Sequence, residues 1–110
     1  ILQYGADSHY KDPLAGVGLT TYGYREIMRK IHDLAHRVSQ GRLIVTGGGG
    51  YDLDATKRIW SIGFITLTDL EVDISDLHDK LINDLMRTRY AAREHIDRIK
   101  SFLKKYYRNL

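Results

Sequence analysis

Residues 43–51 of this chain have the sequence Leu-Ile-Val-Thr-Gly-Gly-Gly-Gly-Tyr, an apolar segment followed by four glycines and Tyr51. Glycine loses more conformational freedom on folding than any other residue, so four in a row are unfavourable unless the backbone must be approached closely. The stretch therefore predicts a strand, then a glycine turn, and a tyrosine hydroxyl held at the mouth of that turn.

Patterns typical of strands and helices lie on the N-terminal side of this turn. Residues 1–4 are a short apolar strand candidate, and residues 42–46 form the second. Between them, Thr20 fits a helix N-cap and Gly41 the position of a left-handed C-cap. Apolar residues recur there at three- and four-residue steps, which predicts an amphipathic helix with one buried stripe. The stripe contains Tyr24, Ile27, Met28, Ile31, Leu34, Ala35 and Val38.

Three further helices are expected after the turn. Asp52 or Asp54 would cap a helix that is apolar on most sides and runs to about Leu67. The spacing of three leucines predicts a separate third helix, and a last helix is expected over residues 93–107. The leucines are Leu77, Leu81 and Leu85, and the last helix is expected to bury Ile96, Ile99, Phe102, Leu103 and Tyr106.

The order strand, helix, strand followed by helices predicts an α/β fold with parallel strands. Two parallel strands alone leave faces and edges uncovered, so we expect a missing portion of the same domain to supply the remaining strands. Ligands of such sheets bind beyond the carboxyl ends of the strands. Asp7 and residues 47–51 both follow such ends, so we expect them to meet at one rim.

Composition narrows the classes of function. The 110 residues carry a net charge of +3 and contain no cysteine, which excludes disulfides and thiolate metal sites and fits a reducing, cytoplasmic setting. No apolar run is long enough to span a membrane, so no membrane partner is expected. Residues 87–108 are basic after an acidic stretch, but a solvated helix face explains this better than nucleic-acid binding.

The polar candidates have ordinary and chemical interpretations. From composition alone, Asp7 is better explained as a turn cap than as a metal ligand. Asp7 and His9 lie two residues apart and could face one metal ion, although zinc needs three or four ligands. His32 and His36 have a spacing that zinc sites use, but they lie at the edge of the polar helix face, so a solvated pair is favoured.

The glycine turn has two functional interpretations and one structural one. Free backbone N–H groups at a helix start could bind phosphate or a nucleotide, although no lysine followed by serine or threonine comes after the last glycine. Alternatively, the glycines could wall a slot for a substrate chain, with Tyr51 donating a hydrogen bond to a developing oxyanion. A tight turn with a packed tyrosine is the structural alternative.

Several motifs taken together resemble the zinc-dependent histone deacetylase superfamily, most closely its acetoin-utilisation deacetylase-like branch. The resemblance covers about the first two thirds of the chain. The motifs are Leu2-Gln3-Tyr4-Gly5-Ala6-Asp7-Ser8, Asp12-Pro13-Leu14, Leu19-Thr20-Thr21-Tyr22-Gly23-Tyr24, Gly47-Gly48-Gly49-Gly50-Tyr51-Asp52 and Arg58-Ile59-Trp60.

This resemblance implies the C-terminal part of an arginase/deacetylase-like fold with a parallel sheet and three layers. It implies hydrolysis of an acetylated lysine, polyamine or small acyl-amine. By analogy, Asp7 is one of three zinc ligands and Tyr51 stabilises the tetrahedral oxyanion. Leu14 would line the acyl-lysine tunnel, and Gly48 and Gly49 would form part of its wall.

The resemblance also implies what this segment lacks. The family's other two zinc ligands and its paired catalytic histidines lie upstream, and no histidine of this chain matches them. A lone carboxylate cannot hold catalytic zinc. We therefore expect residues 1–110 to be inactive without the N-terminal part of the same deacetylase domain.

Overall fold

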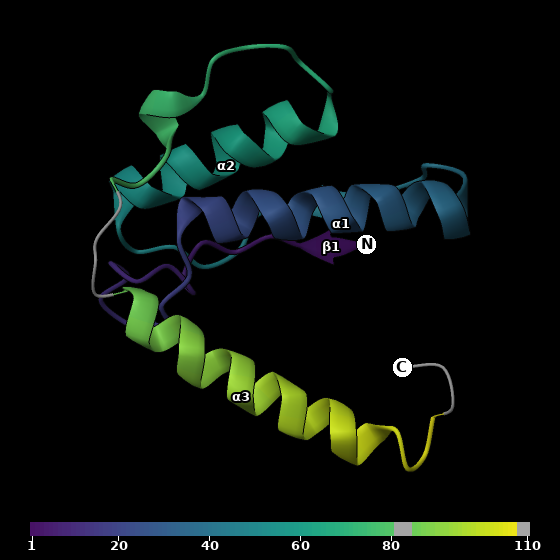
Figure 1. Ribbon diagram of the computed structural model, residues 1–110. Coiled ribbons are helices and arrows are strands. Elements are labelled where there is room, and N and C mark those ends of the chain that lie inside the picture. The colour runs from purple at the N-terminus through teal and green to yellow at the C-terminus, as the bar shows by residue number, and fades with distance from the viewer. Residues whose placement is uncertain (81–84, 108–110) are drawn as a thin grey trace. The chain divides into compact units, whose positions relative to one another are not determined.

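The computed structural model describes residues 1–80 and 85–107 (Figure 1). Along the chain the elements are β1 (Leu2–Gln3), α1 (Thr21–Ser39), β2 (Val45–Thr46), α2 (Leu53–Leu67), a 3₁₀ turn η1 (Ser75–Leu77) and α3 (Leu85–Leu103). Contacts divide the chain into two compact units, residues 1–79 and residues 80–110. The predicted α/β class is confirmed for the first unit.

The two strands pair in parallel, as the strand–helix–strand order predicts. Leu2 lies opposite Val45 and Gln3 opposite Thr46. The paired region is shorter than the apolar segments that predicted it, but backbone bonds extend it, with the Tyr4 N–H donating to the Thr46 carbonyl at 2.9 Å. The strand ends therefore stay together as the chain enters the glycine turn.

Capping side chains set the helix boundaries where the sequence placed them. The Thr20 hydroxyl accepts the Gly23 N–H, and the Asp52 carboxylate accepts the Ala55 N–H at 2.8 Å. At the end of α1, Gln40 and Gly41 both adopt left-handed conformations, with φ of 55° and 76°. These two residues terminate the helix, because each successive left-handed residue turns the chain out of the α-helical path.

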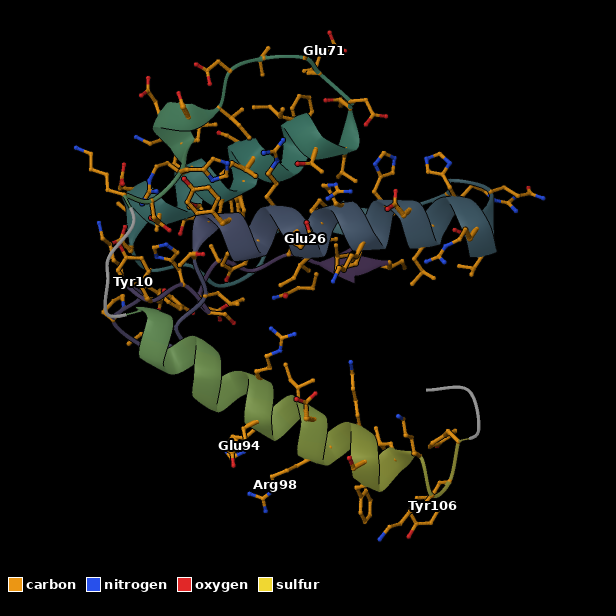
Figure 2. All side chains as sticks on the ribbon, in the orientation of Figure 1. Tyr10, Glu26, Glu71, Glu94, Arg98 and Tyr106 are labelled. Atoms are coloured by element: carbon orange, nitrogen blue, oxygen red, sulfur yellow. The ribbon has the colours of Figure 1, made fainter. Side chains whose placement is uncertain are left out.

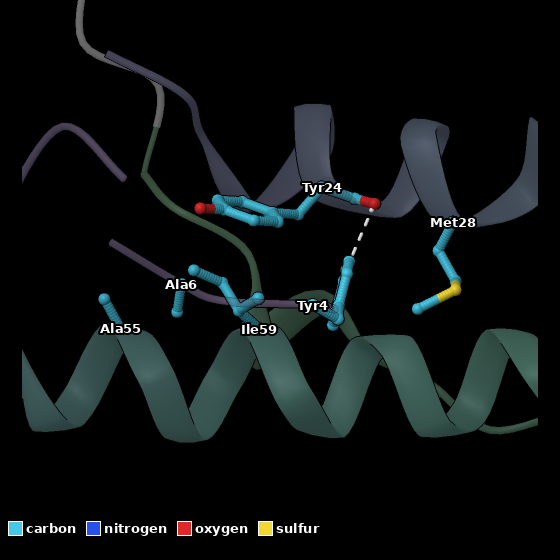
Figure 3. Close-up of a cluster of buried hydrophobic side chains, with 6 residues drawn as sticks. All are labelled: Tyr4, Ala6, Tyr24, Met28, Ala55 and Ile59. Atoms are coloured by element: carbon cyan, nitrogen blue, oxygen red, sulfur yellow. Dashed lines mark hydrogen bonds between the residues drawn. The ribbon is translucent and has the colours of Figure 1, made fainter. Parts of the chain in front are cut away.

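The core of the first unit lies between α1 and α2, with the segment after β1 between the two helices (Figure 3). Its buried side chains are Tyr4, Ala6, Tyr24, Met28, Ala55 and Ile59. The Tyr4 hydroxyl donates to the Tyr24 carbonyl at 3.2 Å, and the two rings meet edge to face with centroids 5.6 Å apart. This geometry buries an aromatic ring while giving its hydroxyl a partner.

Trp60 on α2 holds the end of β1 against the helix. Its indole N–H donates to the Tyr4 carbonyl at 3.0 Å. A Cβ at Gly47 would lie 3.2 Å from the same indole ring, so the glycine gives the ring room against the start of the turn. Trp60 therefore contacts the end of β1 and the start of the glycine turn. These contacts explain why the Arg-Ile-Trp motif contains a tryptophan.

The buried stripe of α1 is narrower than predicted. Tyr24, Met28 and Ala35 are buried, but Leu34 and Val38 are exposed, as is Ile27 at the margin. A seven-residue stripe needs partners on both flanks, whereas α2 covers only one side of α1 in the described part of the chain. The wider prediction was wrong for this reason.

The C-terminal helices also differ from the prediction. A single helix, α3, spans the expected break before residue 93, and only η1 forms near Leu77; Leu81 lies outside the described residues. Ile96, Ile99, Phe102 and Tyr106 are exposed rather than buried. Glu94 and Arg98, four residues apart, project from the same side of α3 (Figure 2). Over its described residues, 80 and 85–107, the second unit has one long helix and no second element to bury its apolar side chains.

Among the described residues, no helix combines the length and the apolar character that crossing a bilayer requires.

Two glycines inside helices give a matched test of this packing. A Cβ at Gly63 would lie 2.7 Å from the Tyr4 ring, whereas a Cβ at Gly23 meets nothing closer than 3.5 Å. Gly63→Ala should therefore destabilise the protein by about 1–3 kcal/mol through overpacking. Gly23→Ala should stabilise it by up to about 1 kcal/mol through helix propensity. Urea unfolding measures both, and equal effects of the two substitutions would contradict the packing described here.

Candidate active site

The end of β1 and the glycine turn lie against each other, as the sequence predicts. The Ala6 N–H donates to the Gly49 carbonyl at 2.6 Å. The Asp7 carboxylate occupies the space beside Gly49, where a Cβ would lie only 2.7 Å from the carboxyl carbon. Asp7 and the turn that leads to Tyr51 therefore share one rim of the first unit.

Each glycine of the turn has a different neighbour. A Cβ at Gly48 would collide with the Gln3 side chain and lie 3.0 Å from the Gly5 backbone. Gly50 has φ of 152°, a conformation that side-chain-bearing residues rarely adopt, and it packs on Thr56 and Ala6. Close approach of neighbouring segments, rather than flexibility, accounts for three consecutive glycines.

The side chains of Tyr51 and Leu14 both face solvent. Tyr51 is 56% exposed and Leu14 is 72% exposed. Their backbones are nevertheless fixed by one carboxylate, because Asp12 accepts the N–H groups of Tyr51 and Leu14 at 2.9 Å each. An exposed phenol on an anchored backbone is free to donate to a substrate.

The carboxylates near the rim differ in how many hydrogen bonds they accept. Asp12 and Asp79 are buried and accept several hydrogen bonds each. Among the residues whose side chains the structure describes, 1–80 and 93–107, no hydrogen bond to the Asp7 carboxylate is found, so its oxygens are open. Those residues contain no group of three or more histidine, cysteine or acidic side chains that could hold a metal. Among the residues described, Asp7 is thus a single rim carboxylate and not a member of a metal-binding cluster.

His9 does not join Asp7, so the joint metal site that their spacing allowed, but that the sequence did not favour, is not formed. The His9 ring is fully buried, and its Nε2 lies 3.0 Å from the Asp79 carboxylate. Asp79 also accepts the N–H and hydroxyl of Thr21, at 2.8 and 3.1 Å, and pairs with Arg58 at 2.9 Å. This buried network ties the loop after Asp7 to the start of α1 and to α2.

The network stabilises the ionised form of Asp79. Burial pushes its pKa upward, but hydrogen bonds from Thr21, Arg58 and His9 outweigh burial and lower the pKa from 3.8 to about 2. A buried carboxylate with this many donors is expensive to protonate. The stability of the first unit is therefore linked to the charge of Asp79.

His32 and His36 point at one another on the exposed side of α1, with their Nε2 atoms 2.9 Å apart. This separation is that of an N–H···N hydrogen bond, and no third donor joins the two rings in the part of the chain that the structure describes. The prediction of a solvated pair fits this geometry.

Sequence reasoning gave Asp12 and Asp79 no role of their own. The Asp12-Pro13 dipeptide does carry a turn signal, because aspartate before proline favours turn initiation. That signal predicts the local bonds to Leu14 and Ala15, but it contains nothing about Tyr51. Asp79 has no local signal, since its partners are 21 to 70 residues away in the chain.

Comparison with protein families gives a match over most of the first unit. A model of the histone deacetylase domain matches residues 1–67, a range that includes both strands, the glycine turn, α1 and α2. No solved structure gives a significant match.

Curated relatives cover different lengths of the chain. The acetoin utilization protein AcuC of Bacillus subtilis is 48% identical over 65 residues, covering 54% of this chain and 17% of that protein. AcuC of Staphylococcus aureus strain MRSA252 is 35% identical over 80 residues, covering 72% and 21%. A protein of Archaeoglobus fulgidus named "Probable deacetylase" is 30% identical over 111 residues, covering 94% and 31%. The chain thus spans less than a third of the length of these relatives.

Stability as a function of pH tests the Asp79 network. The folded-state pKa lies below the ordinary value, so the stabilisation is complete above about pH 4 and is lost as the pH falls toward 2. We expect this loss to be about 2 kcal/mol, measured by urea unfolding at each pH. Asp79→Asn should remove the part of the pH dependence in that window that Asp79 contributes, and cost about 3 kcal/mol at pH 7.

Asp54→Asn is the matched control for Asp79→Asn. Asp54 pairs with the same Arg58 at 2.9 Å, but its side chain is 66% exposed. Its loss should cost less than about 1 kcal/mol. A cost equal to that of Asp79→Asn would show that burial of the network is not what stabilises the protein.

Proposed function

Because the chain belongs to the histone deacetylase domain family, we propose that it forms part of a zinc-dependent deacetylase that hydrolyses an acetyl-lysine-like amide. The observation that carries this proposal is the shared rim. Asp7 lies against Gly49, and the same turn leads to an exposed Tyr51. A carboxylate, and a phenol on the turn beside it, are two of the groups that metal-assisted amide hydrolysis uses.

Asp7 is the proposed zinc ligand of this segment. A carboxylate oxygen is an accepted zinc ligand, and Asp7 is a rim carboxylate that no group among the described residues occupies. The remaining ligands and the histidines that transfer protons would come from other parts of the domain. Zinc, when bound, would supply Lewis acidity toward the amide carbonyl.

Tyr51 is the proposed oxyanion donor. As the amide carbon becomes tetrahedral, negative charge grows on the carbonyl oxygen, and a hydroxyl already aimed at that oxygen stabilises it without reorganisation. Gly48 and Gly49 have no side chains that could block a linear substrate, and Leu14 presents an exposed apolar surface near the same backbone. We propose that these three residues contact the alkyl chain of an acylated lysine, polyamine or small amine.

A phosphate- or nucleotide-binding module is the second candidate. The four glycines before an N-capped helix favour it, because such turns expose backbone N–H groups. However, the side chains of Gln3 and Asp7 lie against Gly48 and Gly49 where a Cβ would stand, and a carboxylate beside the turn repels an anion. The deacetylase proposal is therefore preferred.

Tyr51→Phe in the full-length protein that carries this chain distinguishes the two candidates. Removing the hydroxyl should lower kcat for an acetyl-lysine peptide by about 10²–10³, because one oxyanion donor is lost. Phosphate binding by backbone groups would be unchanged. Tyr22→Phe is the control, since Tyr22 stacks on His78 away from the turn and should leave kcat within about twofold. Full activity of Tyr51→Phe would contradict the role of the phenol.

The chain alone gives a second test. A single rim carboxylate cannot hold catalytic zinc, so residues 1–110 should bind less than stoichiometric zinc after dialysis and show no acetyl-lysine hydrolysis. Metal analysis and a fluorogenic deacetylase assay measure both quantities. Tight stoichiometric zinc together with turnover would show that this segment contains a complete site.

A further inference from the structure

Asp12 connects two segments of the rim that are far apart in the sequence. One carboxylate oxygen, Oδ1, accepts the N–H groups of Leu14 at 2.9 Å and Ala15 at 3.0 Å. The other oxygen, Oδ2, accepts the N–H of Tyr51 at 2.9 Å, across 39 residues of chain. Both oxygens are therefore used, one on each segment.

The local bonds alone are an ordinary turn motif. An aspartate commonly accepts the N–H groups two and three residues later, and Asp73 does so with Ser75 at 2.9 Å. The bond to Tyr51 has no such local explanation. Asp12 is also only 6% exposed, whereas Asp73 is exposed, so the bridging carboxylate is withdrawn from water.

The hydrogen bonds around Asp12 stabilise its ionised form. Desolvation raises the pKa of Asp12, but hydrogen bonds from Ala15, Tyr51 and Leu14 outweigh it and leave the pKa below its ordinary value. Only an ionised carboxylate accepts at both oxygens; an amide offers one acceptor and places an N–H₂ group against the remaining donors. A neutral substitute would leave at least one backbone N–H without a partner.

Tyr51 needs such an anchor because little else holds it. Its side chain is 56% exposed, and the preceding Gly50 sits in a conformation that glycine alone adopts readily. An oxyanion donor must lie within hydrogen-bond reach of one oxygen atom, and a displacement of about 1 Å can cost about 10²-fold in rate. The hydrogen bond from the Tyr51 N–H to Asp12 fixes the backbone position from which the phenol side chain extends.

We propose that Asp12 is a positioning residue that holds the backbone of Tyr51 at a set distance from Leu14. Asp12 thereby sets the position of the oxyanion donor, Tyr51, relative to Leu14 in the wall that contacts the substrate. This inference rests on the proposed function, because it takes Tyr51 to be the donor and Leu14 to be part of that wall.

A double-mutant cycle in the full-length protein tests the inference. Asp12→Asn should lower kcat for an acetyl-lysine peptide about tenfold or more, with the zinc content unchanged because Asp12 does not hold Asp7. In a Tyr51→Phe background the same substitution should change kcat by less than about twofold, since the donor it positions is already absent. A general loss of folded protein would instead multiply with Tyr51→Phe and lower the zinc content.

Asp73→Asn is the matched control, because it removes the same kind of turn carboxylate from an exposed site. It should leave kcat within about twofold. Asp12→Glu keeps the charge but moves the oxygens, so a kcat between those of the wild type and Asp12→Asn is expected.

The outcomes separate this inference from the function on which it rests. If Tyr51→Phe leaves kcat unchanged, the proposed function fails. If Tyr51→Phe lowers kcat but Asp12→Asn does not, or if the two losses multiply, the positioning role of Asp12 is overturned.

Hydrogen exchange of the wild-type protein decides the matter if both Asp12 variants fail to fold. The amide of Tyr51 should exchange at least about 10²-fold more slowly than in an unstructured peptide, because Asp12 accepts its N–H. Exchange at the unstructured rate would show that the anchor is absent and would overturn the inference.

Discussion

The close approach of the strand end at Asp7 to the backbone of the glycine turn is the constraint on which the rim depends. The Ala6 N–H bonds to the Gly49 carbonyl, and the side chains of Gln3 and Asp7 fill the places where Gly48 and Gly49 lack a Cβ. Any side chain on the turn would push the two segments apart. The glycines therefore give the rim its geometry as well as its access.

Two buried carboxylates stabilise the segments that form this rim. Asp12 bridges the loop of Leu14 to the backbone of Tyr51, and Asp79 joins the loop of His9 to α1 and α2. Each is a buried carboxylate that accepts at least one hydrogen bond from a distant segment. No described residue donates a hydrogen bond to Asp7, so two of the three carboxylates build the rim and the third is open.

The apolar core supports the rim through α2. Ile59 packs in the core, while its neighbours on either side bind outside it: Arg58 reaches Asp79, and Trp60 donates to the Tyr4 carbonyl. Three consecutive residues thus link the hydrophobic core to the Asp79 network and to the end of β1. Several apolar side chains, including Phe64 on α2 and Val38 on α1, remain exposed, in keeping with a segment that spans less than a third of its relatives.

The sequence alone determined the parallel strand–helix–strand unit, the caps at Thr20 and Asp52 and the meeting of Asp7 with the glycine turn. These follow from periodicity, capping and strand polarity, which act over a few residues or through simple topology. Only the tertiary structure decided that His9 binds Asp79 rather than sharing a metal with Asp7, that Asp12 reaches Tyr51, and that three of the seven residues in the predicted α1 stripe stay exposed. The choice of a partner among distant polar groups, and the face of a helix that is covered, depend on which segments the fold places side by side, and no local pattern contains that information.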